Sequence, residues 1–164
     1  MATHLKSLSD FAHLEVHSAE AFTFGIVVAQ WNVTVTGALY DGAYQLLLDK
    51  GVKPENIKTI QVPGSFELTS GADMLLHDPS IDAVVCLGCV IQGETRHFDF
   101  ICDAVAHGIT NVSLKYSKPV IFGVLTTDNQ QQAEDRAGGI HGNKGEEAAI
   151  TAIQMAQIHS EIVK

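Results

Sequence analysis

Short apolar segments alternate with longer segments of helical periodicity along the chain. Continuous apolar runs rich in β-branched residues are typical of strands that are covered on both faces. The predicted strands are Phe22–Gln30, Ile57–Val62, Asp82–Ile91 and Val120–Leu125. Apolar residues at intervals of three and four predict amphipathic helices. The predicted helices are Thr36–Lys50, Phe66–His77, Phe98–Lys115, Asn129–Arg136 and Gly145–Ile162.

This alternation of strands and helices predicts an α/β fold with a parallel sheet. Right-handed crossovers place helices on both faces of the sheet, which gives a three-layer doubly wound sandwich around four parallel strands. A chain of 164 residues fits a single domain over residues 1–164. Residues 21–164 form the predicted α/β core, and residues 1–20 form an N-terminal arm that packs on a neighbour or stays mobile.

Composition narrows the class of protein. Charged residues make up 18% of the chain, below the roughly 25% of typical soluble proteins. This low fraction favours a surface that is partly covered by copies of the same chain. Some ordinary monomers have the same composition, however. A net charge of −9 argues against a nucleic-acid partner. No run of ~18 apolar residues predicts a membrane span, and the first twenty residues lack the apolar segment of a secretory signal. We therefore expect a cytoplasmic protein without a membrane partner.

The cysteines and two of the histidines raise the question of a metal or redox site. Cys86 and Cys89 form a single C-x-x-C pair, which redox and zinc sites also use. Cys86 lies inside an apolar strand, however, and no second pair is present, so buried structural cysteines are predicted. His13 and His17 lack the glutamate of a metalloprotease motif and are predicted to lie on a solvated arm. No metal site is expected.

Candidate site residues follow the first two strands. In doubly wound sheets, ligands bind beyond the carboxyl ends of the strands. Trp31 ends the first strand and is either a core residue that covers the sheet or a platform on which a heterocycle stacks. Glu67 follows the Pro63-Gly64 turn and is either an acid favoured at a helix N-terminus or an acceptor for sugar hydroxyls.

The third strand leads into a candidate anion site. Gly93 lets the backbone approach a ligand closely, and the N–H groups of Glu94 and Thr95 are expected to open a helix. His97 would fall in the first turn of that helix, where a neutral imidazole can act as a general base at pH 7. A lone histidine is more often structural, but its place beside an anion site favours a functional role.

Two cations flank a glycine-rich segment after the fourth strand. Arg136 precedes the Gly138–Gly145 segment by two positions, and Lys144 lies near the end of the segment. The segment is either a flexible connector between helices or part of a phosphate site. In the second case the guanidinium would hold phosphate bidentately and the ammonium would add a point charge.

Four of these segments resemble motifs of the lumazine synthase family. They are Pro63–Glu67 (PGSFE), Gly88–Phe98 (GCVIQGETRHF), Phe122–Asp128 (FGVLTTD) and Arg136–Gly145 (RAGGIHGNKG), and they keep the family's order and spacing. The resemblance covers roughly Phe22–Ile162 and implies a flavodoxin-like sandwich. It also implies an activity in riboflavin biosynthesis, the condensation of 5-amino-6-(D-ribitylamino)uracil with 3,4-dihydroxy-2-butanone 4-phosphate to 6,7-dimethyl-8-ribityllumazine. Phosphate is released, and neither a metal nor an organic cofactor is required.

The resemblance also implies roles for individual residues. His97 would be the catalytic residue that transfers protons. The implied substrate-binding residues are Trp31, Ser65, Phe66, Glu67, Cys89, Val90, Ile91, Glu94, Thr95, Phe122, Arg136 and Lys144. Among these, Trp31 would stack on the pyrimidine, and the backbone of Val90 and Ile91 would contact its edge. Glu94 and Thr95 would bind phosphate. Phe122, Arg136 and Lys144 would come from the adjacent subunit.

This chain departs from the family pattern at three positions. Gln92 stands where many members carry Arg, Cys89 where many carry Thr, and Trp31 where Phe is more common. We expect these differences to tune affinity, because none of them removes an implied catalytic group.

The resemblance implies an assembly and leaves two other functions open. The family builds homopentamers, some of which form sixty-subunit shells, and the Gly138–Gly145 loop has the length seen in shell-forming members. One alternative is an archaeal-style riboflavin synthase, which would use dimethylribityllumazine as its only substrate. The other is a non-catalytic flavin carrier that stacks the ring on Trp31 and Phe66. His97 beside an anion site argues against a carrier, which needs neither.

Overall fold

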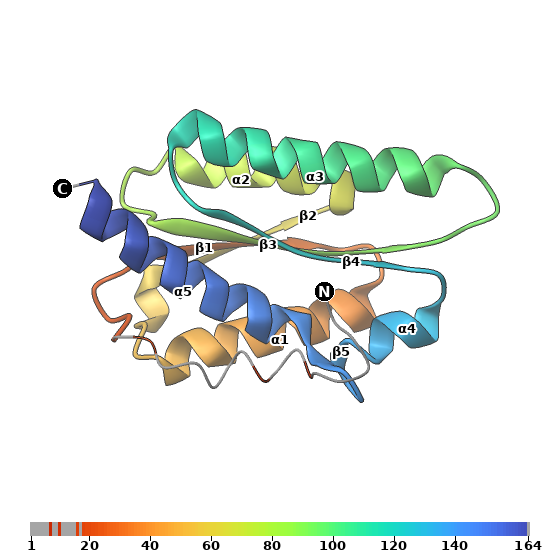
Figure 1. Ribbon diagram of the computed structural model, residues 1–164, viewed down its shortest axis with the longest axis horizontal. Helices are drawn as coiled ribbons and strands as arrows, with labels where there is room; N and C mark the ends of the chain where they lie inside the picture. The colour runs from red at the N-terminus through yellow and green to blue at the C-terminus, as the bar shows by residue number, and fades with distance from the viewer. Residues whose placement is uncertain (1–6, 8–9, 11–15, 17, 164) are drawn as a thin grey trace.

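The computed structural model describes residues 7, 10, 16 and 18–163 and has three layers (Figure 1). The middle layer is a four-stranded parallel sheet with the strand order β2-β1-β3-β4. Its strands are β1 (Phe24–Ala29), β2 (Ile57–Val62), β3 (Ala83–Ile91) and β4 (Val120–Thr127). The predicted doubly wound α/β fold is confirmed.

Helices cover both faces of the sheet (Figure 1). On one face lie α1 (Val33–Asp49) and α5 (Lys144–Ile162), and on the other lie α2 (Leu68–Leu76) and α3 (His97–Tyr116). The remaining elements are short. They are the 3-10 turns η2 (Pro54–Asn56) and η3 (Ser65–Glu67), the helix α4 (Gln130–Glu134), and the strands β5 (Ala137–Gly139) and β6 (Gly142–Asn143).

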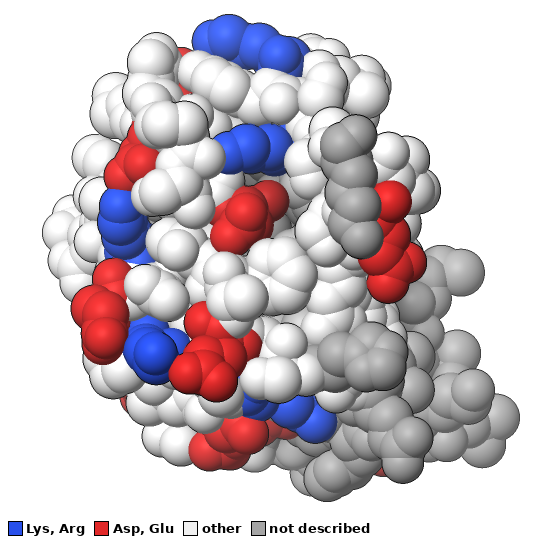
Figure 2. Space-filling view, turned by 90° about the vertical axis from the view of Figure 1, so that its left-hand side faces the viewer, with Lys and Arg blue, Asp and Glu red and all other residues white. Residues whose placement is uncertain are grey.

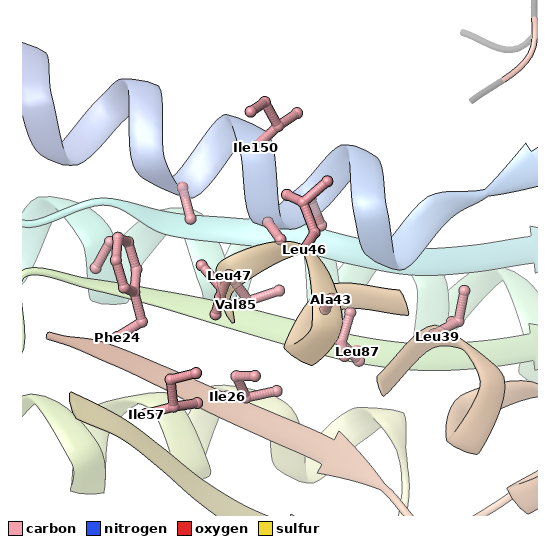
Figure 3. Close-up of a cluster of buried hydrophobic side chains, with 14 of the residues drawn as sticks. Phe24, Ile26, Leu39, Ala43, Leu46, Leu47, Ile57, Val85, Leu87 and Ile150 are labelled. Carbon is pink, nitrogen blue, oxygen red and sulfur yellow. The ribbon is translucent and has the colours of Figure 1, made fainter. Parts of the chain in front are cut away.

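The alternation of side chains along each strand divides the core into two halves. Phe24 and Ile26 of β1 point toward α1 and α5, where they join Leu39, Leu47 and other buried side chains (Figure 3). Val27, the residue after Ile26, points to the opposite face and joins the cluster beneath α2 and α3. Because both faces of the central strands β1 and β3 are buried, these two strands are almost continuously apolar, which is the pattern that made them predictable.

The same alternation separates the C-x-x-C pair. The side chain of Cys86 lies in the core half beneath α2 and α3, whereas that of Cys89 lies in the half beneath α1 and α5. Both are buried and free of disulfides. Two thiols on opposite faces of a sheet cannot form a disulfide or share a metal, so the prediction of buried structural cysteines is confirmed.

The segment after β4 differs from the prediction. The predicted helix Asn129–Arg136 is confined to Gln130–Glu134, where the side chain of Asn129 caps it by accepting the N–H of Gln132. The glycine-rich stretch is a small antiparallel hairpin formed by β5 and β6 rather than an irregular connector. Gly138 and Gly142 have positive φ angles of 106° and 81°, which residues with a Cβ rarely adopt.

The predicted arm ends in contact with its own core. Ala19 is fully buried, and its N–H donates to the carbonyl of Lys50 (3.0 Å), while Glu20 forms an ion pair with Lys53. His13 and His17 lie outside the described residues. None of the helices in the described part of the chain is long and apolar enough to cross a membrane. The end of the molecule where α5 finishes carries acidic and basic side chains in neighbouring positions (Figure 2).

Candidate functional site

A pocket of about 290 Å3 opens at the carboxyl ends of the strands. It lies where the strand order reverses, since β2 lies on one side of β1 and β3 on the other. This switch point is where doubly wound sheets form their ligand crevice. The residues that line the pocket are Trp31, Asn32, Gly64, Ser65, Phe66, Glu67, Cys89, Val90, Ile91, His97 and Ile101. Eight of them were predicted from the sequence, and they come from the ends of β1, β2 and β3.

Two aromatic rings stand exposed at this pocket. Trp31 is 72% exposed and Phe66 is 56% exposed. The interpretation of Trp31 as a core residue covering the sheet is therefore wrong. A large exposed ring at a pocket gains apolar burial when a flat heterocycle stacks on it, so the exposure supports the alternative interpretation.

The turn after β2 supplies a hydroxyl and a carboxylate. Ser65 is buried, and its Oγ donates to the carbonyl of Cys89 (3.4 Å). Gly88 permits this contact, because a Cβ there would lie 2.7 Å from the Ser65 hydroxyl. Glu67 stands at the N-cap position of α2 but makes no capping hydrogen bond there. Its carboxylate is thus able to accept hydrogen bonds from a polyol.

The backbone at the end of β3 presents polar groups to the pocket. The last residue pair between β1 and β3 is Val28 with Leu87, so β3 continues beyond its neighbour. The N–H of Gln92 donates to the Thr127 carbonyl on the β4 side (2.8 Å). Because backbone groups alternate in direction along a strand, the N–H and C=O of Ile91 point to the opposite side, where β1 has ended. This edge can pair with the polar edge of a heterocycle.

His97 reaches the pocket from the first residue of α3. Its side chain is exposed, and its backbone N–H is bonded to Thr95 Oγ1 (3.4 Å). Glu94 and Thr95 do not open the helix as predicted, because α3 begins at His97 and both residues lie in the preceding loop. Neither of them lines the pocket.

Three predicted residues lie away from the pocket of their own chain. Phe122 is half-buried on β4, at the edge of the sheet, and packs against the core half beneath α2 and α3. Arg136 and Lys144 are neighbours, since the Lys144 N–H donates to the Arg136 carbonyl (2.9 Å). Arg136 Nη1 donates to the Gln132 carbonyl, and Lys144 Nζ pairs with Glu147. Among the described residues, those lining the pocket include neither lysine nor arginine.

Sequence reasoning missed three lining residues, namely Asn32, Gly64 and Ile101. Gly64 belongs to the turn that was singled out, and Ile101 lies one helical turn after His97, so a local signal existed for both. Asn32 directly follows Trp31, so its place had a local signal as well, but its contact with Cys89, 57 positions away in sequence, had none. Within the described ranges, no three His, Cys, Asp or Glu side chains are grouped closely enough to hold a metal ion.

Comparison with known proteins identifies relatives over nearly the whole chain. The family model described as 6,7-dimethyl-8-ribityllumazine synthase matches residues 21–160. A protein of that name from Cytophaga hutchinsonii is 59% identical, covering 94% of this chain and 97% of its own. A protein of the same name from Parabacteroides distasonis is 54% identical, covering 94% of this chain and 97% of its own. One from Phocaeicola vulgatus is 46% identical, covering 100% of this chain and 98% of its own. The chain belongs to the 6,7-dimethyl-8-ribityllumazine synthase family.

Proposed function

We propose that this protein is a 6,7-dimethyl-8-ribityllumazine synthase of riboflavin biosynthesis. It condenses 5-amino-6-(D-ribitylamino)uracil with 3,4-dihydroxy-2-butanone 4-phosphate and releases phosphate. The observation that carries the proposal is one pocket, at the switch point of the sheet, that gathers two exposed aromatic rings, a carboxylate and His97. Membership of the family and the names of its relatives point to the same reaction.

The pocket residues suit the two substrates. The pyrimidine stacks on Trp31 and Phe66 with its edge against the backbone of Val90 and Ile91, and the ribityl hydroxyls donate to Glu67. The 5-amino group attacks the ketone, and loss of water gives an imine. Elimination then expels phosphate, and the second amine closes the ring with loss of another water. His97 moves the protons, and positioning supplies the rest, without a metal or an organic cofactor.

The phosphate requires a cation that the described pocket residues do not contain. Arg136 and Lys144 of an adjacent subunit fill this need, with Phe122 of that subunit covering the pocket and with Glu94 and Thr95 contacting the phosphate from the pocket's own chain. The active unit is a homopentamer, which some family members extend to a sixty-subunit shell. Three free cysteines favour a reducing compartment, and we place the enzyme in the cytoplasm.

A fluorescence assay with both substrates tests the proposed function directly. Incubation of the protein with the pyrimidine and the sugar phosphate is expected to give fluorescent lumazine and one phosphate per product. Riboflavin formed from dimethylribityllumazine alone would indicate a riboflavin synthase instead. Quenching of Trp31 fluorescence by riboflavin, without product from the two substrates, would indicate a carrier.

A further inference from the structure

We infer that Asn32 is a positioning residue, which orients the backbone edge of β3 that receives the pyrimidine. The inference rests on the proposed function and deepens it. Asn32 lines the pocket directly after Trp31, and its Nδ2 donates to the carbonyl of Cys89 at the end of β3 (3.1 Å).

The backbone of Asn32 is held in an uncommon conformation. Its φ and ψ angles are 59° and 47°, which is the left-handed region. Asn tolerates this region better than most residues with a side chain. Asn32 precedes α1 but makes no side-chain capping bond to that helix. The amide instead reaches across to β3, so the turn that carries Trp31 is tied to the neighbouring strand.

The carbonyl of Cys89 has no partner in the sheet. β1 pairs with β3 only as far as Leu87, while the alternation of backbone groups points the Cys89 carbonyl to the side on which β1 has ended. A buried carbonyl needs a hydrogen-bond donor. Asn32 Nδ2 and Ser65 Oγ both donate to it, from the turns that follow β1 and β2.

Fixing this carbonyl fixes the groups that follow it. The peptide between Cys89 and Val90 is planar, so the direction of the Cys89 carbonyl also sets the direction of the Val90 N–H. The next peptide ends in the N–H of Ile91, which faces the pocket. Ser65 also holds this carbonyl, but the hydrogen bond from Asn32 is the one that ties the turn carrying Trp31 to the polar edge of the site.

Two substitutions separate the effect of losing the side-chain amide from the effect of the left-handed backbone at position 32. Asn32→Asp keeps the size of the side chain and tolerates a left-handed backbone, but it places a carboxylate oxygen against the Cys89 carbonyl. Asn32→Gly accepts the conformation freely and removes the contact. Ser117→Gly is the matched control, because Ser117 (φ 51°) is the other non-glycine residue with a positive φ in the described part of the chain and lies outside the pocket.

The measurements are the KM of each substrate, kcat and the melting temperature. Both Asn32 variants are expected to raise the KM of the pyrimidine by about tenfold, as expected for one oriented hydrogen bond. The KM of the sugar phosphate is expected to stay within about twofold, because only the pyrimidine uses this edge. Binding of the pyrimidine alone can be measured by the quenching of Trp31 fluorescence. Its affinity is expected to fall as the KM of the pyrimidine rises. Ser117→Gly is expected to leave both KM values, kcat and the binding of the pyrimidine unchanged.

The outcomes distinguish this inference from the proposed function. A pyrimidine KM that stays at the wild-type value in Asn32→Asp would overturn the inference while leaving the function intact. Equal rises in both KM values would also overturn it, because they would indicate general disruption of the fold. Wild-type protein that makes no lumazine from the two substrates contradicts the proposed function itself.

Discussion

At the scale of single residues, His97 combines an exposed imidazole at the pocket with a backbone held by Thr95. General acid–base catalysis is typically worth about 10²–10⁴ in rate, but positioning survives the loss of the imidazole, so His97→Ala is expected to slow turnover by about 10–100-fold. Steady-state formation of lumazine measures the effect. His107→Ala is the matched control, since His107 is exposed on the same helix away from the pocket. An unchanged rate in His97→Ala would remove His97 from the mechanism.

The cysteines test the assignment of the C-x-x-C pair to the core. Burial raises the pKa of Cys86 to about 12 and that of Cys89 to about 11. Thiolates are the reactive species, so neither residue is expected to react with iodoacetamide at pH 8 in the folded protein. Both are expected to react after unfolding in denaturant, as mass spectrometry of the alkylated peptides would show. Rapid alkylation of Cys86 in the native protein would show that this thiol is not buried.

At the scale of elements, the contact between α1 and α5 depends on glycine. A Cβ at Gly145 would lie 1.9 Å from the Leu39 carbonyl oxygen, which is backbone and cannot move aside. Gly145→Ala must push α5 away from α1, so it is expected to destabilise the fold by about 1–3 kcal/mol or more. Lys144 and the hairpin that carries Arg136 would move with the helix. Loss of activity is therefore expected to accompany the lower melting temperature.

Gly37 offers the matched control for that substitution. It lies inside α1, and a Cβ there would meet nothing within 4 Å. Gly37→Ala is expected to stabilise the protein by about 0.5–1 kcal/mol, because alanine loses less backbone entropy in a helix. Thermal unfolding of both variants in the same buffer gives the comparison. Similar melting temperatures for the two would contradict the close approach of α5 to Leu39.

The elements also show what the sequence predicts well. Strands such as β3 were predictable because burial on both faces makes them apolar throughout, and long helices were predictable because one face must be apolar. The hairpin of β5 and β6 was missed, because strands of two or three residues carry no periodicity and its glycines resemble a loop. The start of α3 at His97 was missed by one residue, and local sequence rarely fixes such boundaries.

The residues of the candidate site also differ in how well the sequence predicts them. Trp31, Ser65, Phe66 and Glu67 were predictable because they follow strands, and the carboxyl ends of parallel strands meet at one edge. The role of Asn32 was not predictable, because it depends on a contact with Cys89 that exists only after β1 and β3 have paired. The sequence indicated Arg136 and Lys144 as a pair, and the structure brings them together. It did not predict that both lie away from the pocket of their own chain, because that depends on how the whole chain folds.

At the scale of the whole molecule, the proposed active site consists of two halves that a single chain does not bring together. The described residues that line the pocket include His97 but no lysine or arginine, whereas Arg136 lies on the segment after α4. If the halves meet between subunits, Arg136→Ala must damage the pocket of a neighbour. Loss of a charge-assisted contact of about 1.5–3 kcal/mol is expected to raise the KM of the sugar phosphate and leave that of the pyrimidine nearly unchanged.

Mixing two impaired variants tests whether the halves belong to different subunits. His97→Ala subunits keep a functional Arg136, and Arg136→Ala subunits keep a functional pocket. When equal amounts are unfolded and reassembled together, about a quarter of the shared sites should contain both intact halves by random pairing. Activity at low sugar phosphate is then expected to exceed that of either variant reassembled alone. If Arg136 instead served the pocket of its own chain, every site would carry one defect, and the mixture would show only the average of the two separate activities.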